Sequence, residues 1–178
     1  SFAQAQIDLE VRDFKLPHLL ALLHGEPPAR RVCEIGCATG ELIAAFPVAP
    51  GGERVGLDIS PRHIAAASDR FDAARFAGLR FIAGDFRSVA LPAFDLVILS
   101  DVLEHVEDDA AFLRDAAQRG ARVLINLPLE CNWLNRRRAY GPADVSGHLR
   151  AYTLAQGLQL VASAGLQVQR WSRVWIDR

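Results

Sequence analysis

Residues 31–40, R-V-C-E-I-G-C-A-T-G, constrain the fold of this chain more than any other stretch. A mostly apolar run of strand type leads to a turn with glycines at 36 and 40, and residues 41–46 then take helical spacing. A strand that ends in a glycine-rich turn and opens a helix presents backbone N–H groups, and glycine lets a ligand approach them. We therefore expect an open α/β sheet with a ligand site at the carboxyl end of this strand.

The spacing of the glycines separates two classes of ligand. A dinucleotide fingerprint needs glycines at its first, third and sixth positions, where this chain has Gly36, Ala38 and Glu41. Only the first position fits, which disfavours a nicotinamide-dependent oxidoreductase. Glu34 adds a carboxylate just before the turn. This combination favours a ligand with hydroxyls and a positive group over one with a pyrophosphate.

Three segments resemble those of class I S-adenosylmethionine-dependent methyltransferases. Residues 34–40 resemble motif I, an acidic residue followed by x-G-x-G-x-G, with Ala38 in the middle glycine position. Residues 94–106, F-D-L-V-I-L-S-D-V-L-E-H-V, are similar to the motif IV region of small-molecule members. Residues 147–153, G-H-L-R-A-Y-T, are similar to an element of one branch, the type 11/12-like methyltransferases. The order of these elements matches the family over residues 30–165.

Alternating strand and helix signals predict an α/β fold. The segment 94–100 is a continuous apolar run, typical of a central strand buried on both faces, and a polar sixth strand over 166–175 is expected near a sheet edge. We expect a three-layer Rossmann-like sandwich, a mostly parallel sheet of six or seven strands with helices on both faces. The seventh, antiparallel strand of the family has no candidate, which predicts a chain that is cut short or rearranged there.

The length of 178 residues, with 51% hydrophobic content, fits one domain over residues 1–178. Residues 1–25 are predicted to form a helical cap interrupted near Pro17, whose first part covers the sheet or acts as a lid over the ligand. Residues 127–152 are predicted to be a substrate-side insertion. The arginines at 136–138 are either solvated or recognise a carboxylate or phosphate on the acceptor.

Carboxylates also follow the second and third predicted strands. Asp58 lies about 20 residues beyond the turn, where a carboxylate meets ribose hydroxyls, although Ser60-Pro61 also makes it a candidate for the turn before a helix. Asp85 and Phe86 could contact adenine, or be a capping and a core residue. The resemblance implies S-adenosylmethionine as cofactor and S-adenosylhomocysteine as product. The implied site comprises Glu34, Gly36, Cys37, Ala38 and Gly40 near the methionine part, Asp58 and Ile59 at the ribose, Asp85 and Phe86 at adenine, and Ser100 beside the sulfonium.

The resemblance implies methyl transfer to a small-molecule acceptor, by in-line displacement on a sulfonium. A base is needed only if the acceptor arrives protonated, and the candidates are His105, His148 and Asp101. Each histidine could instead have an orienting or structural role. The sequence does not decide between oxygen, nitrogen and carbon acceptors. The alternative function is a non-catalytic binding module of the same fold.

Composition limits the partners. A net charge of -1 gives no general reason to expect nucleic acid or a membrane as a partner. Trp133 and the arginines at 136–138 favour a small, polar or acidic acceptor over nucleic acid, and the oligomeric state is left open. The chain has neither an apolar run of about 18 residues nor a signal-peptide pattern, which predicts a cytoplasmic protein. Cys33 and Cys37 lack partners at metal-ligand spacing, so no metal site is expected. The lack of methionine indicates a processed or trimmed chain.

Overall fold

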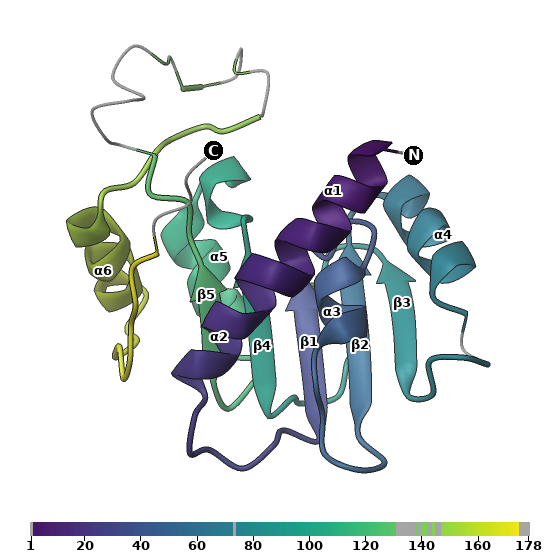
Figure 1. Ribbon diagram of the computed structural model, residues 1–178. Coiled ribbons are helices and arrows are strands. Elements are labelled where there is room, and N and C mark those ends of the chain that lie inside the picture. Colours follow the sequence, from purple (N-terminus) through teal and green to yellow (C-terminus); the bar gives the residue numbers. More distant parts are fainter. Residues whose placement is uncertain are drawn as a thin grey trace.

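The computed structural model describes residues 2–72, 74–130, 138, 140, 141, 144 and 147–174, with side chains from residue 6 onward. Five parallel strands form a sheet in the order β3-β2-β1-β4-β5 (Figure 1). Cys33 of β1 pairs with both Val55 and Val97, at the point where the strand order reverses. Ligands of open α/β sheets bind at such a point. The strands are β1 (Arg31–Ile35), β2 (Glu53–Asp58), β3 (Leu79–Ala83), β4 (Leu96–Ser100) and β5 (Val123–Asn126).

Helices cover both faces of the sheet and confirm the predicted three layers. Alternate residues of β4 face opposite sides, so Leu96 and Ile98 pack in one apolar core while Val97 and Leu99 pack in the other. The first core is covered by α1 (Phe2–Glu10), the π-helix η1 (Val11–Lys15), α2 (Leu16–Leu22), α3 (Glu41–Ala45) and α4 (Pro61–Arg70). The second is covered by α5 (Asp109–Ala117) and α6 (Leu154–Ser163).

The N-terminal helical stretch is continuous, so the predicted interruption near Pro17 is wrong. In η1 the main-chain N–H of Leu16 donates to the carbonyl of Val11, five residues earlier. This wider turn places Pro17 in the first turn of α2, where a residue without an N–H is tolerated. As a result, α1, η1 and α2 run as one diagonal rod across the sheet (Figure 1).

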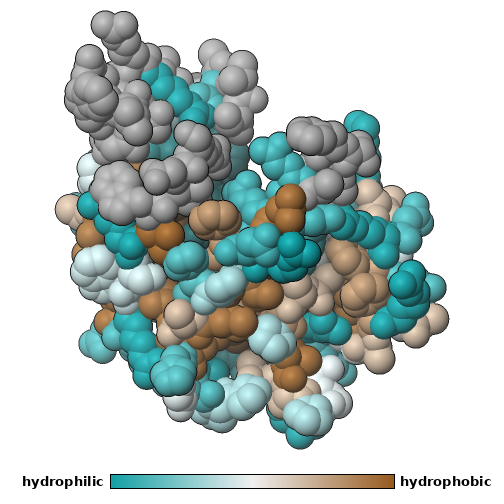
Figure 2. Space-filling model, viewed as in Figure 1, coloured by the Kyte–Doolittle hydropathy of each residue, from teal (hydrophilic) through white to brown (hydrophobic). Residues whose placement is uncertain are grey.

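This rod buries only part of its apolar surface. Val11 and Leu19 are buried, and Figure 2 shows apolar side chains among polar ones on the face that the rod crosses. An ion pair between Asp8 of α1 and Arg70 of α4 also fixes the rod. Among the rod's side chains from residue 6 onward, the large exposed apolar ones are Ile7, Leu9 and Phe14.

The predicted sixth strand is wrong for the described residues 166–174, none of which lies in a strand. Gly165, with φ +78°, ends α6 in the left-handed conformation. Beyond it, the Arg170 guanidinium donates to the main-chain carbonyls of Leu22 and His24. A side chain, rather than strand pairing, thus holds this segment against the end of α2. The sheet of the described residues therefore has five strands instead of six or seven.

One carboxyl group lies inside the core of the sheet. Glu34 of β1 is 4% exposed, and its Oε2 accepts the main-chain N–H of Ile43 in α3 at 3.0 Å. Burial raises the pKa of Glu34 to about 8, although this hydrogen bond and the charge of Lys15 lower it. Since the ordinary pKa is 4.5, the folded chain holds this proton more tightly than the unfolded chain.

Replacing Glu34 with glutamine is expected to flatten part of the pH dependence of stability. A raised folded-state pKa stabilises the fold below pH 4.5, and this contribution is lost as the pH rises through about 8. The free energy of unfolding of the wild type, measured by denaturant titration, should therefore fall relative to that of Glu34→Gln by at most about 1.4 kcal/mol per pH unit in this window. Glu53→Gln, at an exposed site, is the control and should show a constant difference. A constant difference for Glu34→Gln as well would contradict the assignment.

Candidate functional site

The turn between β1 and α3 has the tight backbone that the sequence predicts. Gly36, Ala38 and Gly40 all have positive φ, at +79°, +47° and +85°. A Cβ atom at Gly36 would lie 2.6 Å from Cγ2 of Val102, and one at Gly40 would lie 2.5 Å from Cε1 of Phe81. The packing of neighbouring elements therefore requires these glycines. The close approach of a ligand, which the sequence suggested, stays a prediction.

Asp58 ends β2 beside this turn, as predicted. Its Oδ2 accepts the main-chain N–H of Ala38 at 2.9 Å, and its Oδ1 accepts that of Ser60 at 2.9 Å. His63 of α4 lies with Nδ1 3.3 Å from Oδ1, and Ile59 is 79% exposed. Asp58 thus stabilises the turn before α4 and also brings a carboxylate to the β1 turn. Because a carboxylate oxygen can accept two hydrogen bonds, Oδ2 can also bind a ligand hydroxyl.

The residues after β3 differ in exposure. The exposed Asp85 accepts the main-chain N–H of Arg87 at 2.9 Å. Phe86 is 3% exposed, and its ring centroid lies 5.0 Å from that of Phe112 in α5. In the structure the Phe86 ring packs in the core. A contact of Phe86 with a purine stays a prediction. Cys37 of the β1 turn is also buried.

A polar cluster at the end of β4 joins three parts of the chain. Asp101, with φ +55°, pairs through its carboxylate with Nζ of Lys15 in η1 at 2.6 Å. The same carboxylate accepts hydrogen bonds from Nδ2 of Asn126 in β5 at 3.2 Å and from the hydroxyl of Ser100 at 3.1 Å. Asp101 therefore ties the N-terminal rod to the sheet, next to the residue expected beside the sulfonium.

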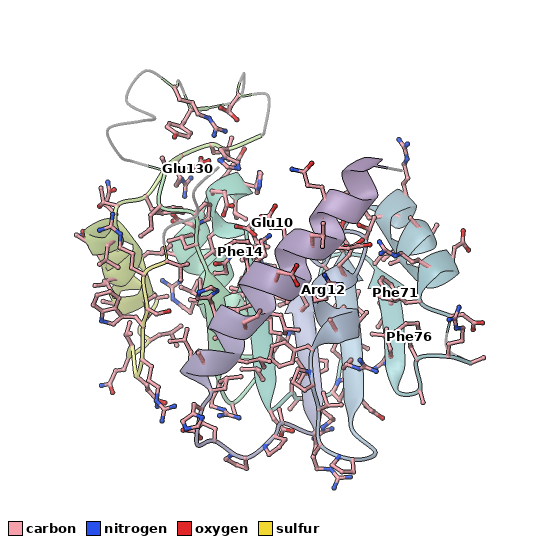
Figure 3. The ribbon with its side chains drawn as sticks, viewed as in Figure 1. Glu10, Arg12, Phe14, Phe71, Phe76 and Glu130 are labelled. Atoms are coloured by element: carbon pink, nitrogen blue, oxygen red, sulfur yellow. The ribbon has the colours of Figure 1, made fainter. Side chains whose placement is uncertain are left out.

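A second cluster brings the two predicted histidine bases together. His105 ends the 3-10 helix η2 (Leu103–His105), and its ring centroid lies 4.8 Å from that of His148. Nδ1 of His105 lies 3.0 Å from the carbonyl oxygen of Gly147. Nδ1 of His148 lies 2.7 Å from Oε2 of Glu130. Glu130, which Figure 3 labels, follows β5 in the chain. In each histidine, Nδ1 thus donates to an oxygen, which fixes the orientation of the ring. The lone pair of Nε2 then remains available to accept a proton or another bond.

Glu104 precedes the first of these histidines and is 1% exposed. Neither of its carboxylate oxygens has a hydrogen-bond partner in the described part of the chain, and Oε1 lies 3.9 Å from Nε2 of His105. Burial raises the pKa of Glu104 to about 7, and the charges of Asp101 and Glu130 add to this effect. Among the described residues, Glu104, His105 and His148 could hold a metal ion, since their ligand atoms lie within 4.8 Å of one another.

The sequence did not indicate four polar residues of this edge. Asn126 ends β5 and so could have been found by the rule that places functional groups at carboxyl ends. Lys15 and Glu130 reach their partners from distant segments, and no local pattern marks such contacts. The burial of Glu104 results from tertiary packing, which no local sequence pattern signals.

The chain matches a family model described as "Methyltransferase domain" over residues 33–120, from β1 to just beyond α5. It is 32% identical over 111 residues to ubiquinone biosynthesis O-methyltransferase of Rhodopseudomonas palustris strain TIE-1. It is 31% identical over 111 residues to the enzyme of that name from strain BisA53. Each match covers 58% of this chain, and the chain spans 41% of the length of these curated relatives.

Solved methyltransferase structures have a similar fold. Magnesium protoporphyrin IX methyltransferase from Synechocystis PCC 6803, with bound S-adenosylhomocysteine, aligns with a TM-score of 0.70 and 22% identity, over 93% of this chain and 78% of that one. The N-terminal domain of EvdMO1, in the presence of S-adenosylhomocysteine and D-fucose, aligns with a TM-score of 0.63 and 20% identity, over 84% and 71% of the two chains. At these identities the likeness concerns the fold.

The matched stretch contains the β1 turn, Asp58 and β4, and the sheet around it is parallel with its switch point at β1. These elements also carried the resemblance seen in the sequence. Residues 33–120 of this chain thus match the methyltransferase-domain family model, and the described fold is similar to that of solved methyltransferases.

Proposed function

We propose that this chain is an S-adenosylmethionine-dependent methyltransferase that acts on a small-molecule acceptor. The observation that carries the proposal is the placement of Asp58, whose carboxylate accepts the N–H of Ala38 and so lies against the β1 turn. This arrangement puts an acceptor for ribose hydroxyls beside backbone that a ligand can approach. Similar structures contain bound S-adenosylmethionine or S-adenosylhomocysteine.

The residues present fit this cofactor. Oδ2 of Asp58 can accept a second hydrogen bond, the exposed Ile59 offers apolar surface, and the exposed Asp85 can accept from an exocyclic amine. The turn from Gly36 to Gly40 and the carboxyl of Glu34 would lie at the methionine end, with Ser100 beside the sulfonium. When bound, the cofactor supplies a methyl group on an already activated sulfonium.

The protein contributes mainly alignment and exclusion of water. The rod from α1 to α2 crosses the sheet, and its Lys15 reaches the carboxyl end of β4 through Asp101. This contact holds the rod at the carboxyl edge of the sheet, where the rod would cover a bound ligand. If the acceptor arrives protonated, His105, His148 and Asp101 are the groups that could take its proton.

We further propose oxygen as the methylated atom, because the curated relatives at 31% and 32% identity are O-methyltransferases. Residues 127–152 would shape the acceptor side of a single domain, with residues 1–25 as its helical cap. An acidic acceptor stays part of the proposal. The guanidinium of Arg138 already pairs with Glu130 and Asp144, and Arg136 and Arg137 lie outside the described residues.

Every helix in the described ranges is too short or too polar to span a lipid bilayer. A cytoplasmic location remains part of the proposal.

Asp58→Asn is expected to weaken binding of S-adenosylhomocysteine about 10- to 100-fold, because a charged acceptor of ribose hydroxyls becomes a neutral amide. Isothermal titration calorimetry with the wild type and the variant measures this change. Asp69→Asn, at an exposed site on α4, is the matched control and should keep wild-type affinity. Equal affinity of wild type and Asp58→Asn would refute the ribose assignment. Heat from NADH in place of S-adenosylhomocysteine would favour an oxidoreductase.

Transfer of a labelled methyl group tests the activity itself. The protein should move label from S-adenosylmethionine to the oxygen of a hydroxylated small molecule, and acceptors with and without a carboxylate separate the acidic class from the neutral one. Mass spectrometry of the product identifies the methylated atom. The Asp58→Asn protein serves as the control with impaired cofactor binding. Tight binding of S-adenosylhomocysteine without transfer to any acceptor would instead support a non-catalytic module.

A further inference from the structure

The side chain of Arg70 joins the N-terminal rod to two helices of the sheet layer. Arg70 is the last residue of α4, and its guanidinium pairs with Asp8 of α1 and with Glu41 of α3, the latter at 2.8 Å. The guanidinium also lies over the ring of Phe71, 5.0 Å from the ring centroid, which restricts its orientation. Because a guanidinium has donors on two sides, one side chain can bridge the two carboxylates.

Glu41 carries this contact into the β1 turn. It is the first residue of α3, directly after Gly40, and its side chain is buried. The hydroxyl of Thr39 donates to the Glu41 carboxylate, with its oxygen 2.8 Å from Oε1 and 2.9 Å from Oε2. Thr39 lies within the turn from Gly36 to Gly40. A continuous chain of polar contacts therefore runs from α1 through Arg70 and Glu41 to this turn.

The attachment of α1 depends on such polar contacts. None of the side chains of residues 6–10 is buried, and the first buried side chain of the rod is Val11 in η1, which packs against α3. Asp8 and Arg70 are both partly exposed, so their ion pair is only modestly stabilising. Figure 1 shows α1 beyond η1, at the carboxyl ends of the strands. An element with few buried contacts opens at a low free-energy cost, and α1 is such an element.

We propose that Arg70 is a positioning residue of the cofactor site, which couples the docking of α1 to the conformation of the β1 turn. The inference rests on the proposed function, in which this turn holds the methionine part of S-adenosylmethionine. A cofactor on the turn would keep Thr39 and Glu41 in the arrangement that Arg70 binds, so α1 would dock more firmly. Because such coupling is reciprocal, a docked α1 raises the affinity of the turn for the cofactor by the same factor. Arg70 touches no cofactor atom in this scheme and acts through Glu41.

Binding of S-adenosylhomocysteine to the full chain, measured by isothermal titration calorimetry, tests the coupling. Arg70→Gln should weaken binding about 5-fold or more, because the turn loses its link to α1. Arg70→Lys should restore part of the affinity, since an ammonium group can still pair with one of the two carboxylates. Arg62→Gln, at an exposed site of the same helix, is the matched control and should keep wild-type affinity.

A double-variant cycle separates coupling from a local effect of Arg70. Asp8→Asn should weaken binding by a factor similar to that of Arg70→Gln, although Asp8 lies on the rod and not on the turn. Because both changes break the same link, the double variant should bind as weakly as Arg70→Gln alone.

Hydrogen exchange of the α1 amides gives a second readout. S-adenosylhomocysteine should slow this exchange in the wild type, and Arg70→Gln should abolish the slowing without changing exchange in the central strands. In the ligand-free chain, Glu41→Gln should speed α1 exchange as Asp8→Asn does, because Glu41 holds the guanidinium that Asp8 binds. A short helix that loses its docking contacts frays. This ligand-free comparison needs no cofactor, so it separates the coupling from the proposed methyltransferase activity.

Three results would overturn the coupling. They are equal affinity of the wild type and Arg70→Gln, a double variant whose loss equals the product of the two single losses, and α1 exchange that does not respond to Glu41→Gln. Asp8→Asn changes a partly exposed side chain, so it carries the binding test if Arg70→Gln is unfolded by circular dichroism. A wild type that binds no S-adenosylhomocysteine would refute the proposed function, whereas a response of α1 exchange to Glu41→Gln would still support the link between α1 and the turn.

Discussion

The hydrogen bond from the main chain of Ala38 to the carboxylate of Asp58 is the contact on which the proposed site depends. It joins the end of β2 to the turn after β1 at 2.9 Å. The turn has positive φ at three positions, and a side chain at Gly36 or Gly40 would collide with Val102 or Phe81. Sheet packing and one carboxylate therefore fix the same few residues that a ligand at this switch point would contact.

The other side of this edge is organised by charge. Asp101 pairs with Lys15 of the N-terminal rod and accepts a hydrogen bond from Asn126 of β5. It therefore links three segments that are distant in sequence. Next to it, Glu104 is buried without a hydrogen-bond partner among the described residues. The edge thus combines one carboxylate with several partners, which ties distant segments together, and one buried carboxylate whose pKa burial raises to about 7.

Much of the fold could be predicted because its signals are local. The apolar run of β4 depends on neighbours within a few residues, and the structure confirms a strand that is buried throughout. The helix break predicted at Pro17 does not occur, because the π-helix η1 places Pro17 in the first turn of α2, where proline is tolerated. The strand predicted over 166–175 was wrong for the described residues, because the side chain of Arg170 holds this segment against the end of α2 and no strand pairing forms there. In the site, residue types at strand ends could be predicted, but the partners Lys15 and Glu130 could not, since they arrive from remote segments.

The crystal structure of the chain with S-adenosylhomocysteine tests the central claim most directly. The account predicts ribose oxygens within hydrogen-bond distance of the Asp58 carboxylate, with the methionine part lying along the backbone of the turn from Gly36 to Gly40. A ligand bound at any other edge of the sheet, or a ribose that makes no contact with Asp58, would contradict it.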